Sequence, residues 1–405
     1  MIMEPSSRLE PLLEKVRNYI NEAVIPLEQE YVDEIDNGGR WRQSARQREI
    51  LEQLKHGARE QGLWNFFLTE GEHGSGLSTV DYAFIAEETG RSLLAAEAFN
   101  CSAPDTGNME VLAKYGSEAQ KARWLKPLLD GEIRSAYAMT EPDEASSDAT
   151  NISMRAELVD GQWCINGEKT YISGAGDDRC AILICMVKTD PDAARHQQHS
   201  QILVPMDTPG VEVVRPMEVF RQDGAPHGHM HLKLDNVLVP EDHIIAGRGR
   251  GFEIAQGRLG PGRIHHVMRA IGMSEKALQL MCQRSLSRTA FGRPLAKLGG
   301  NYDRIAEARI QIDMARLLTL QTAHVIDTQG VNKAHVWISK IKATVPLIAL
   351  KIIDDAIQMH GAAGLSQDFP LAEMYMNART LRLADGPDEV HRRVVARHEL
   401  KRTKR

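Results

Sequence analysis

The stretch "MRAELVDGQWCI", residues 154–165, decides the fold because the hydrophobic pattern of the chain changes there. Apolar residues occupy alternate positions on both sides of the dipeptide Asp160-Gly161: Met154, Ala156, Leu158, Trp163 and Ile165. A period of two predicts strands, and Asp-Gly between two such runs predicts a two-residue hairpin turn. The stretch therefore predicts an antiparallel hairpin within a β region.

The β pattern extends well beyond this hairpin. Short apolar runs bounded by turn residues predict further strands at residues 181–187, 201–204, 211–214 and 231–239. On either side the spacing is helical, with breaks at residues 37–39 and 71–76. Two later stripes have helical spacing: Ile264, Val267, Met268 and Ile271, then Ile305, Ala308, Ile312 and Ala315.

The order of these regions predicts a mostly α protein with a central β domain. We expect an N-terminal helical domain at 1–134, a middle β domain at 135–247 and a C-terminal helical bundle at 248–405. "GRGRGF" at 247–252 lacks a surrounding βαβ unit, and no phosphate-binding G-x-x-x-x-G-K-[ST] motif occurs. Any nucleotide cofactor must be held by another device.

Composition limits the kind of protein and partner. The 405 residues are 42% hydrophobic and 26% charged, as in ordinary globular proteins, and the net charge of -6 argues against nucleic acid or an anionic membrane as the main partner. Five cysteines without a C-x-x-C pair suggest neither a disulfide framework nor a zinc knuckle. With no signal peptide and no long apolar run, we expect a cytoplasmic protein.

Residues 136–152, "AYAMTEPDEASSDATNI", take an apolar strand into a loop rich in Ser and Asp. Short hydroxyls and free backbone N–H groups in such a loop suit a phosphate or the polar edge of a flavin, whereas a solvated turn is the simpler interpretation. Four more motifs follow in order along the chain: "KTYISGAGD" (169–177), "RTAFGRPL" (288–295), "AIQMHGAAG" (356–364) and "LRLADGPDEVHRR" (381–393).

With these motifs the chain resembles the acyl-CoA dehydrogenase family over essentially its whole length. "EPDEASSDATNI", "PHGH", "GRLGPGRIHH" and "LADGPDEVH" are similar to the branch typified by the dehydrogenase domains of human family members 10 and 11. The resemblance implies a helical N-terminal domain, a middle β-barrel and a C-terminal four-helix bundle, with FAD at their junction and at a subunit interface. It also implies a homodimer or homotetramer.

The reaction implied by the resemblance is FAD-dependent α,β-dehydrogenation of an acyl-CoA to trans-2-enoyl-CoA, as in fatty acid β-oxidation. Electrons would pass to an electron-transfer flavoprotein. Asp385 matches the catalytic carboxylate, and no metal is expected. The residues that match cofactor contacts are Met139, Thr140, Tyr171, Ser173, Arg288, Phe291, Gln358 and Gly361. Those that match substrate contacts are Ser147, Arg263 and Gly386.

The chain departs from the family pattern near the catalytic carboxylate. Asp385 stands where most relatives have the longer Glu, and Pro387 replaces a hydroxyl residue. Asp388 and Glu389 are acids that a helix start would use in any case. Two rival functions remain: a flavin oxidase of the same fold with an Asp base acting on a nitroalkane, and a DNA-binding flavoprotein that would rely on the basic tail at 401–405.

Two groups of histidines each allow a functional and a structural interpretation. His227, His229 and His231 would share one face of a strand, as metal ligands can, but a turn with separate histidines explains them as well. His265 and His266 follow Arg263 and suit either a polar group of the substrate or packing inside a helix.

Overall fold

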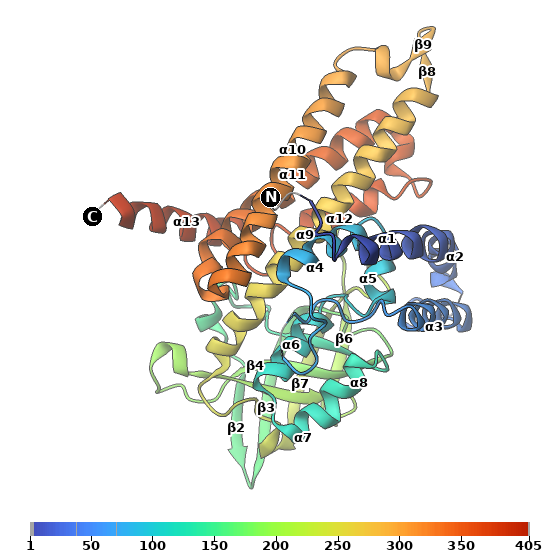
Figure 1. The fold of residues 1–405 in the computed structure, drawn as a ribbon. Helices are drawn as coiled ribbons and strands as arrows, with labels where there is room; N and C mark the ends of the chain where they lie inside the picture. The colour runs from blue at the N-terminus through green and yellow to red at the C-terminus, as the bar shows by residue number, and fades with distance from the viewer. Residues whose placement is uncertain (1–3, 38, 70, 404–405) are drawn as a thin grey trace. The chain divides into compact units, whose positions relative to one another are not determined.

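The computed structural model describes residues 4–37, 39–69 and 71–403, and it confirms the predicted class of helices before and after a central sheet (Figure 1). Gly38 in the first predicted break and the last two residues of the basic tail lie outside this description. The chain divides into two compact units. The first contains the N-terminal segment up to Pro26, Gly76–Ala96 and the chain from Gly260 onward; the second contains Leu27–Ser75 and Glu97–Leu259. The domain boundaries drawn from the sequence stay predictions.

The α-helices are α1 (Glu10–Tyr19), α2 (Ile25–Asp33), α3 (Ala45–Glu60), α4 (Thr79–Thr89), α5 (Ala95–Ala98), α6 (Asp105–Tyr115), α7 (Glu118–Gln120), α8 (Lys126–Leu129), α9 (Gly251–Ser287), α10 (Asn301–Gln329), α11 (Val331–His360), α12 (Leu371–Thr380) and α13 (Asp388–Thr403). The strands are β1 (Arg134–Ala138), β2 (Arg155–Val159), β3 (Gln162–Ser173), β4 (Cys180–Lys188), β5 (His199–Pro205), β6 (Val211–Met217), β7 (His229–Pro240), β8 (Thr289–Ala290) and β9 (Arg293–Pro294). Short π and 3-10 turns are η1 (Ile20–Val24), η2 (Glu34–Asp36), η3 (Lys121–Leu125), η4 (Ala149–Asn151), η5 (Arg195–Gln197), η6 (Glu241–His243), η7 (Leu295–Lys297) and η8 (Gly361–Leu365).

A seven-stranded sheet is the centre of the second unit. Its strand order is β1-β4-β2-β3-β7-β6, and β5 pairs with β4. The predicted hairpin is confirmed: β2 and β3 are antiparallel, with Val159 opposite Gln162. Asp160 and Gly161 between them have φ of 49° and 75°, the positive values that a type I′ turn requires. The four predicted strand runs correspond to β4, β5, β6 and β7.

The inward residues of the sheet form its hydrophobic core. Trp163 and Ile165 of β3 pack in one cluster with residues of β4, β5 and β7. Trp163 is almost completely buried, and its indole Nε1 donates a hydrogen bond to the carbonyl of Glu241 at 3.1 Å. Burial of the large ring is therefore compatible with its polar atom, because that atom keeps a partner.

Long helices make up most of the first unit. α10 and α11 run alongside each other (Figure 1), joined at Gly330, whose φ of 80° permits the reversal. The predicted stripe of α9 between residues 264 and 271 is buried. In α10, Ala308, Ile312 and Ala315 of the second predicted stripe are buried and Ile305 is partly buried. Within the described ranges, no helix combines the length and the apolar composition that a membrane span requires.

Candidate functional site

A buried ion pair fixes the loop that follows β1. Lys169 of β3 is fully buried, and its Nζ donates to the Glu141 carboxylate at 2.8 Å and to the carbonyl oxygens of Met139 and Met186 at 3.0 and 2.7 Å. The other carboxylate oxygen of Glu141 accepts from the backbone and hydroxyl of Ser153. Burial raises the pKa of Glu141, but Lys169 and these donors outweigh it, so the pKa lies below its usual value. Both charges of the pair thus have hydrogen-bond partners, which offset the free-energy cost of burying them.

Three predicted residues lie on or beside this loop in the second unit. Met139 packs against a small cluster that includes Ile152 and Met186, and the Thr140 carbonyl accepts from the backbone of Thr170 at 2.8 Å. Ser147 is exposed near the end of the loop. The loop is therefore ordered at its start by Lys169 and leaves a hydroxyl in solvent at its far end.

Tyr171 and Ser173 lie at the end of β3, where its pairing with β7 is irregular. Tyr171 has a φ of 56°, unusual for an aromatic residue, and it is 55% exposed. Ser173 Oγ lies 2.8 Å from Nδ1 of His229, whose pKa is lowered by burial. The irregularity turns an aromatic ring outward, and such backbone strain is concentrated at binding sites.

The three histidines around β7 have separate partners. His229 contacts Ser173, His231 Nε2 lies 2.7 Å from a Glu168 carboxylate oxygen, and His227 lies between the carboxylates of Glu97 and Asp177. His227 precedes the strand, so the three side chains do not follow one strand face as a metal site would need. In the part of the chain that the structure describes, no group of His, Cys, Asp and Glu is arranged to hold a metal ion.

Asp385 lies on the turn between α12 and α13 in the first unit. Its φ is 54°, and its side chain is 18% exposed. Asp388 is buried in the first turn of α13 and forms an ion pair with Arg382 at 2.8 Å, so its carboxylate has a structural role. Glu389 is exposed. Asp385 thus differs from the buried, ion-paired Asp388 and the exposed Glu389: it is partly exposed, and it lies on an irregular backbone segment.

Arg263 and Gly386 lie beside Asp385. Arg263 Nε donates to the carbonyl oxygen of Asp385 at 2.8 Å. Gly386 has a φ of 99°, and a Cβ placed there would lie 3.2 Å from His391 Nε2 and 3.7 Å from Arg263 Nη2. The structure therefore brings three predicted residues together, and glycine both permits the backbone angle and avoids a tight contact with His391.

A second buried lysine holds this turn. Lys342 of α11 is almost completely buried, and its Nζ donates to the carbonyls of Leu381 and Ala384, the latter at 2.9 Å. Burial lowers the pKa of Lys342, Arg263 acts in the same direction and Asp385 opposes them, so that the pKa is about 8. The ammonium thus ties the carbonyls that precede Asp385 to the middle of a long helix.

The remaining predicted residues lie elsewhere in the first unit. Arg288 directly precedes the short β8–β9 hairpin and is exposed, and Phe291 lies in the turn of this hairpin with 94% exposure. Gln358 is exposed near the end of α11, and Gly361 has a φ of 65° as the helix stops. Arg284 Nη2 lies 3.4 Å from the carbonyl of His360, so the end of α9 and the end of α11 are neighbours.

The predicted cofactor residues include side-chain types that can bind a flavin dinucleotide. An outward aromatic ring such as Tyr171 suits a planar ring system, and an exposed guanidinium such as Arg288 suits a phosphate. Neither Lys169 nor Lys342 was predicted as a site residue, but the sequence pattern around each indicates burial. Lys169 has the inward parity of Trp163 and Ile165 in its strand, and Lys342 lies on the buried stripe of α11 that includes Ile338 and Val345.

Comparison with known proteins gives matches along almost the whole chain. The family models for the N-terminal, middle and C-terminal domains of acyl-CoA dehydrogenase match residues 6–132, 136–237 and 249–400. Mouse acyl-CoA dehydrogenase family members 10 and 11 are 52% and 50% identical over 99% and 98% of the chain, which spans 38% and 51% of their lengths. A solved structure from Mycobacterium abscessus is 51% identical, with a TM-score of 0.95, and covers 99% of this chain and 100% of its own.

We predict that Lys342→Met destabilises the protein by roughly 1–3 kcal/mol, because two carbonyls lose their donor. The folded pKa of about 8 lies below the ordinary 10.5, so the parent gains stability as pH rises between these values. The loss should therefore be larger at ~pH 9 than at ~pH 7. Urea unfolding at both pH values measures this, and Lys333→Met, at an exposed position on the same helix, is the control. Equal midpoints for parent and Lys342→Met would contradict it.

Proposed function

Because the chain belongs to the acyl-CoA dehydrogenase family, we propose that it oxidises an acyl-CoA thioester to the trans-2-enoyl-CoA with FAD as cofactor. The chain is an oxidoreductase, and its identity to family members 10 and 11 confirms the branch that its motifs predicted. The observation that carries the proposal is the partly exposed Asp385 carboxylate on a turn held by Arg263 and Lys342.

The proposed chemistry begins with proton removal. Asp385 takes the α-proton of the thioester, and the carboxylate becomes a carboxylic acid. Arg263 and Lys342 hold the backbone of the turn, so the carboxylate meets the substrate without the cost of ordering the loop. FAD, when bound, supplies the acceptor for the hydride that leaves the β-carbon.

Two groups of residues are proposed as FAD contacts. Met139, Thr140, Tyr171 and Ser173 of the second unit would contact the flavin, and this is supported by the outward ring of Tyr171. The second group lies in the first unit and consists of Arg288, Phe291, Gln358 and Gly361. In this proposal, these residues of a neighbouring subunit bind the phosphates and the adenosine half of FAD. Ser147, Arg263 and Gly386 are the proposed substrate contacts.

The physiological setting is proposed on family grounds. Electrons would pass to an electron-transfer flavoprotein, and the reaction would be a step of fatty acid β-oxidation. The cytoplasmic location stays a prediction from the sequence. A same-fold oxidase would differ in an observable way, because its reduced flavin would react rapidly with oxygen and acyl-CoA would not reduce it.

We predict that the purified protein carries about one FAD per chain. Arg288→Gln should weaken FAD retention by about tenfold or more, because a hydrogen bond to a charged phosphate is lost. Equilibrium dialysis followed by flavin absorbance measures the retained fraction. Arg293→Gln, which changes an exposed arginine of the same hairpin, is the control. Protein that is colourless and cannot be reconstituted with FAD would contradict the cofactor assignment.

We predict that Asp385→Asn slows flavin reduction by acyl-CoA by ~10²–10⁴, because the amide cannot accept the proton. Anaerobic stopped-flow with butanoyl-, octanoyl- and hexadecanoyl-CoA follows flavin bleaching. Glu389→Gln is the matched control, since Glu389 is an exposed acid in the following helix. If Asp385→Asn bleaches as fast as the parent, another residue is the base.

We predict a homodimer or homotetramer, because Ile310, Met314 and Leu317 are 52%, 56% and 41% exposed on α10 at helical spacing. The double change Met314→Glu and Leu317→Glu should lower the mass measured by light scattering, since buried carboxylates without partners oppose association. Gln329→Glu adds charge at an exposed polar position of the same helix and is the control. A monomeric parent with full FAD content would overturn the prediction.

A further inference from the structure

We propose that His266 is a positioning residue for the catalytic base: its Nε2–H holds Oδ2 of Asp385 and fixes the direction in which the carboxylate faces. The inference rests on the proposed function, in which Asp385 is the base. The residues that carry it all lie in the first unit.

The geometry of α9 brings His266 to the carboxylate. Nε2 of His266 lies 3.3 Å from Oδ2 of Asp385, and both side chains are largely buried, at 23% and 18% exposure. One helical turn earlier, a Cβ at Gly262 would lie 3.6 Å from the same oxygen. Positions 262 and 266 share one helix face, so α9 contacts the carboxylate through a glycine, which leaves room, and a histidine, which supplies a donor.

Arg269 determines the tautomer of His266. Its Nη2 lies 3.3 Å from Nδ1 of His266. A guanidinium only donates hydrogen bonds, so Nδ1 must accept, and the single ring proton lies on Nε2, facing Asp385. Burial lowers the pKa of His266, Arg269 and Lys342 act in the same direction, and Asp385 opposes them. The ring is therefore neutral near pH 7 and presents one donor to the carboxylate.

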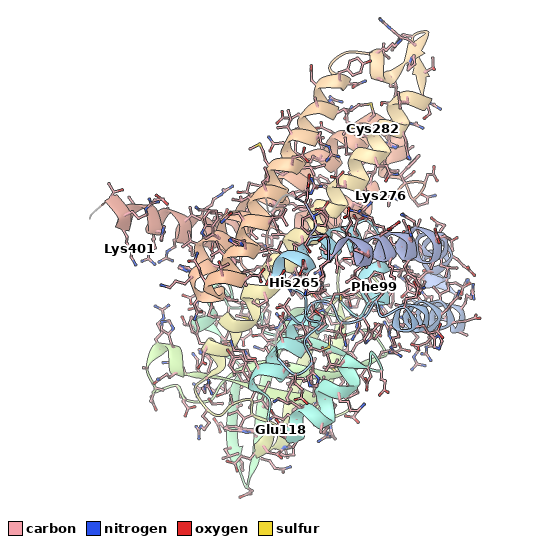
Figure 2. The ribbon with its side chains drawn as sticks, viewed as in Figure 1. Phe99, Glu118, His265, Lys276, Cys282 and Lys401 are labelled. Carbon is pink, nitrogen blue, oxygen red and sulfur yellow. The ribbon has the colours of Figure 1, made fainter. Side chains whose placement is uncertain are left out.

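The adjacent histidine has a different environment. His265, which is labelled in Figure 2, is buried, and its ring packs edge-on against Tyr82 with centroids 4.9 Å apart. Burial holds its pKa well below the usual value. Neighbouring positions on a helix point about 100° apart, so one of the pair packs into the core and the other reaches the carboxylate. His265 is thus a matched control on the same element.

A donor at Oδ2 has two consequences for the base. It restrains a short side chain that would otherwise rotate, and an aspartate has one methylene fewer than glutamate with which to reach a substrate. It also stabilises the charged carboxylate, as do the nearby charges of Arg263 and Lys342, so the base stays ionised to lower pH. Without the donor, flavin reduction should begin to fail at a higher pH, because the carboxylate is protonated more readily.

The kinetic test compares variants of both histidines. His266→Leu should move the acid limb of the pH profile for flavin reduction up by about one pH unit and lower the rate at pH 7 by about tenfold or more. His266→Gln keeps an N–H donor of similar reach and should retain most of the rate, whereas His266→Asn is too short and should behave like Leu. His265→Phe keeps the aromatic contact with Tyr82 and should retain the parental profile.

The outcomes separate this inference from the proposed function. If Asp385→Asn is inactive while His266→Leu and His266→Asn keep the parental rate and acid limb, the positioning role is wrong and the base assignment stands. If Asp385→Asn is as fast as the parent, the base assignment fails first. Should His266→Leu not fold, the comparison of Gln with Asn still decides.

A second measurement needs no substrate. In protein labelled with ¹⁵N-histidine, we expect His266 to show the Nε2–H tautomer, and Asp385→Asn should make the ring titrate at a lower pH, because its charged acceptor is lost. His266→Gln assigns the signal. A ring in the Nδ1–H form, or a titration that Asp385→Asn leaves unchanged, would overturn the proposal.

Discussion

The hydrogen bonds from the Lys342 ammonium to two backbone carbonyls are the constraint on which the proposed catalytic centre depends. The segment between α12 and α13 forms turns, not a regular helix or strand, and its Leu381 and Ala384 carbonyls accept hydrogen bonds from outside the segment. Lys342 supplies them from the middle of a long helix, where the backbone is well fixed. Asp385 follows directly, and its unusual φ is maintained because the residues before it cannot relax.

In the second unit, a buried lysine again donates to backbone carbonyls and fixes an irregular segment. Lys169 reaches from the inward face of β3 to two backbone carbonyls and the Glu141 carboxylate, and so fixes the loop that follows β1. A buried lysine is costly unless its three N–H groups all find acceptors. Lys169 meets that condition with two backbone carbonyls and the Glu141 carboxylate, and Lys342 donates to two backbone carbonyls. Each lysine holds an irregular segment next to proposed binding residues.

The fold could be predicted from the sequence to a large extent. Alternation around Asp160-Gly161 is a local signal, and the hairpin formed where that signal placed it. The apolar stripe of α9 also faces inward as predicted. The burial of Lys169 and Lys342 was not predicted. A lysine within an apolar pattern is expected to be exposed to solvent unless its hydrogen-bond acceptors are known. The carbonyl acceptors of Lys342 lie about 40 residues away in the sequence, so only the tertiary fold brings them to its ammonium.

The sequence by itself determined the order of helical and β regions, the hairpin and the family, because periodicity, turn chemistry and motif order are properties of neighbouring residues. It also singled out Asp385 and a pair of histidines on α9. Only the tertiary structure decided between those histidines: His265 packs on Tyr82, and His266 reaches Asp385. The sequence has no information on which side of a helix meets a distant turn, and that direction is fixed only when the helices pack.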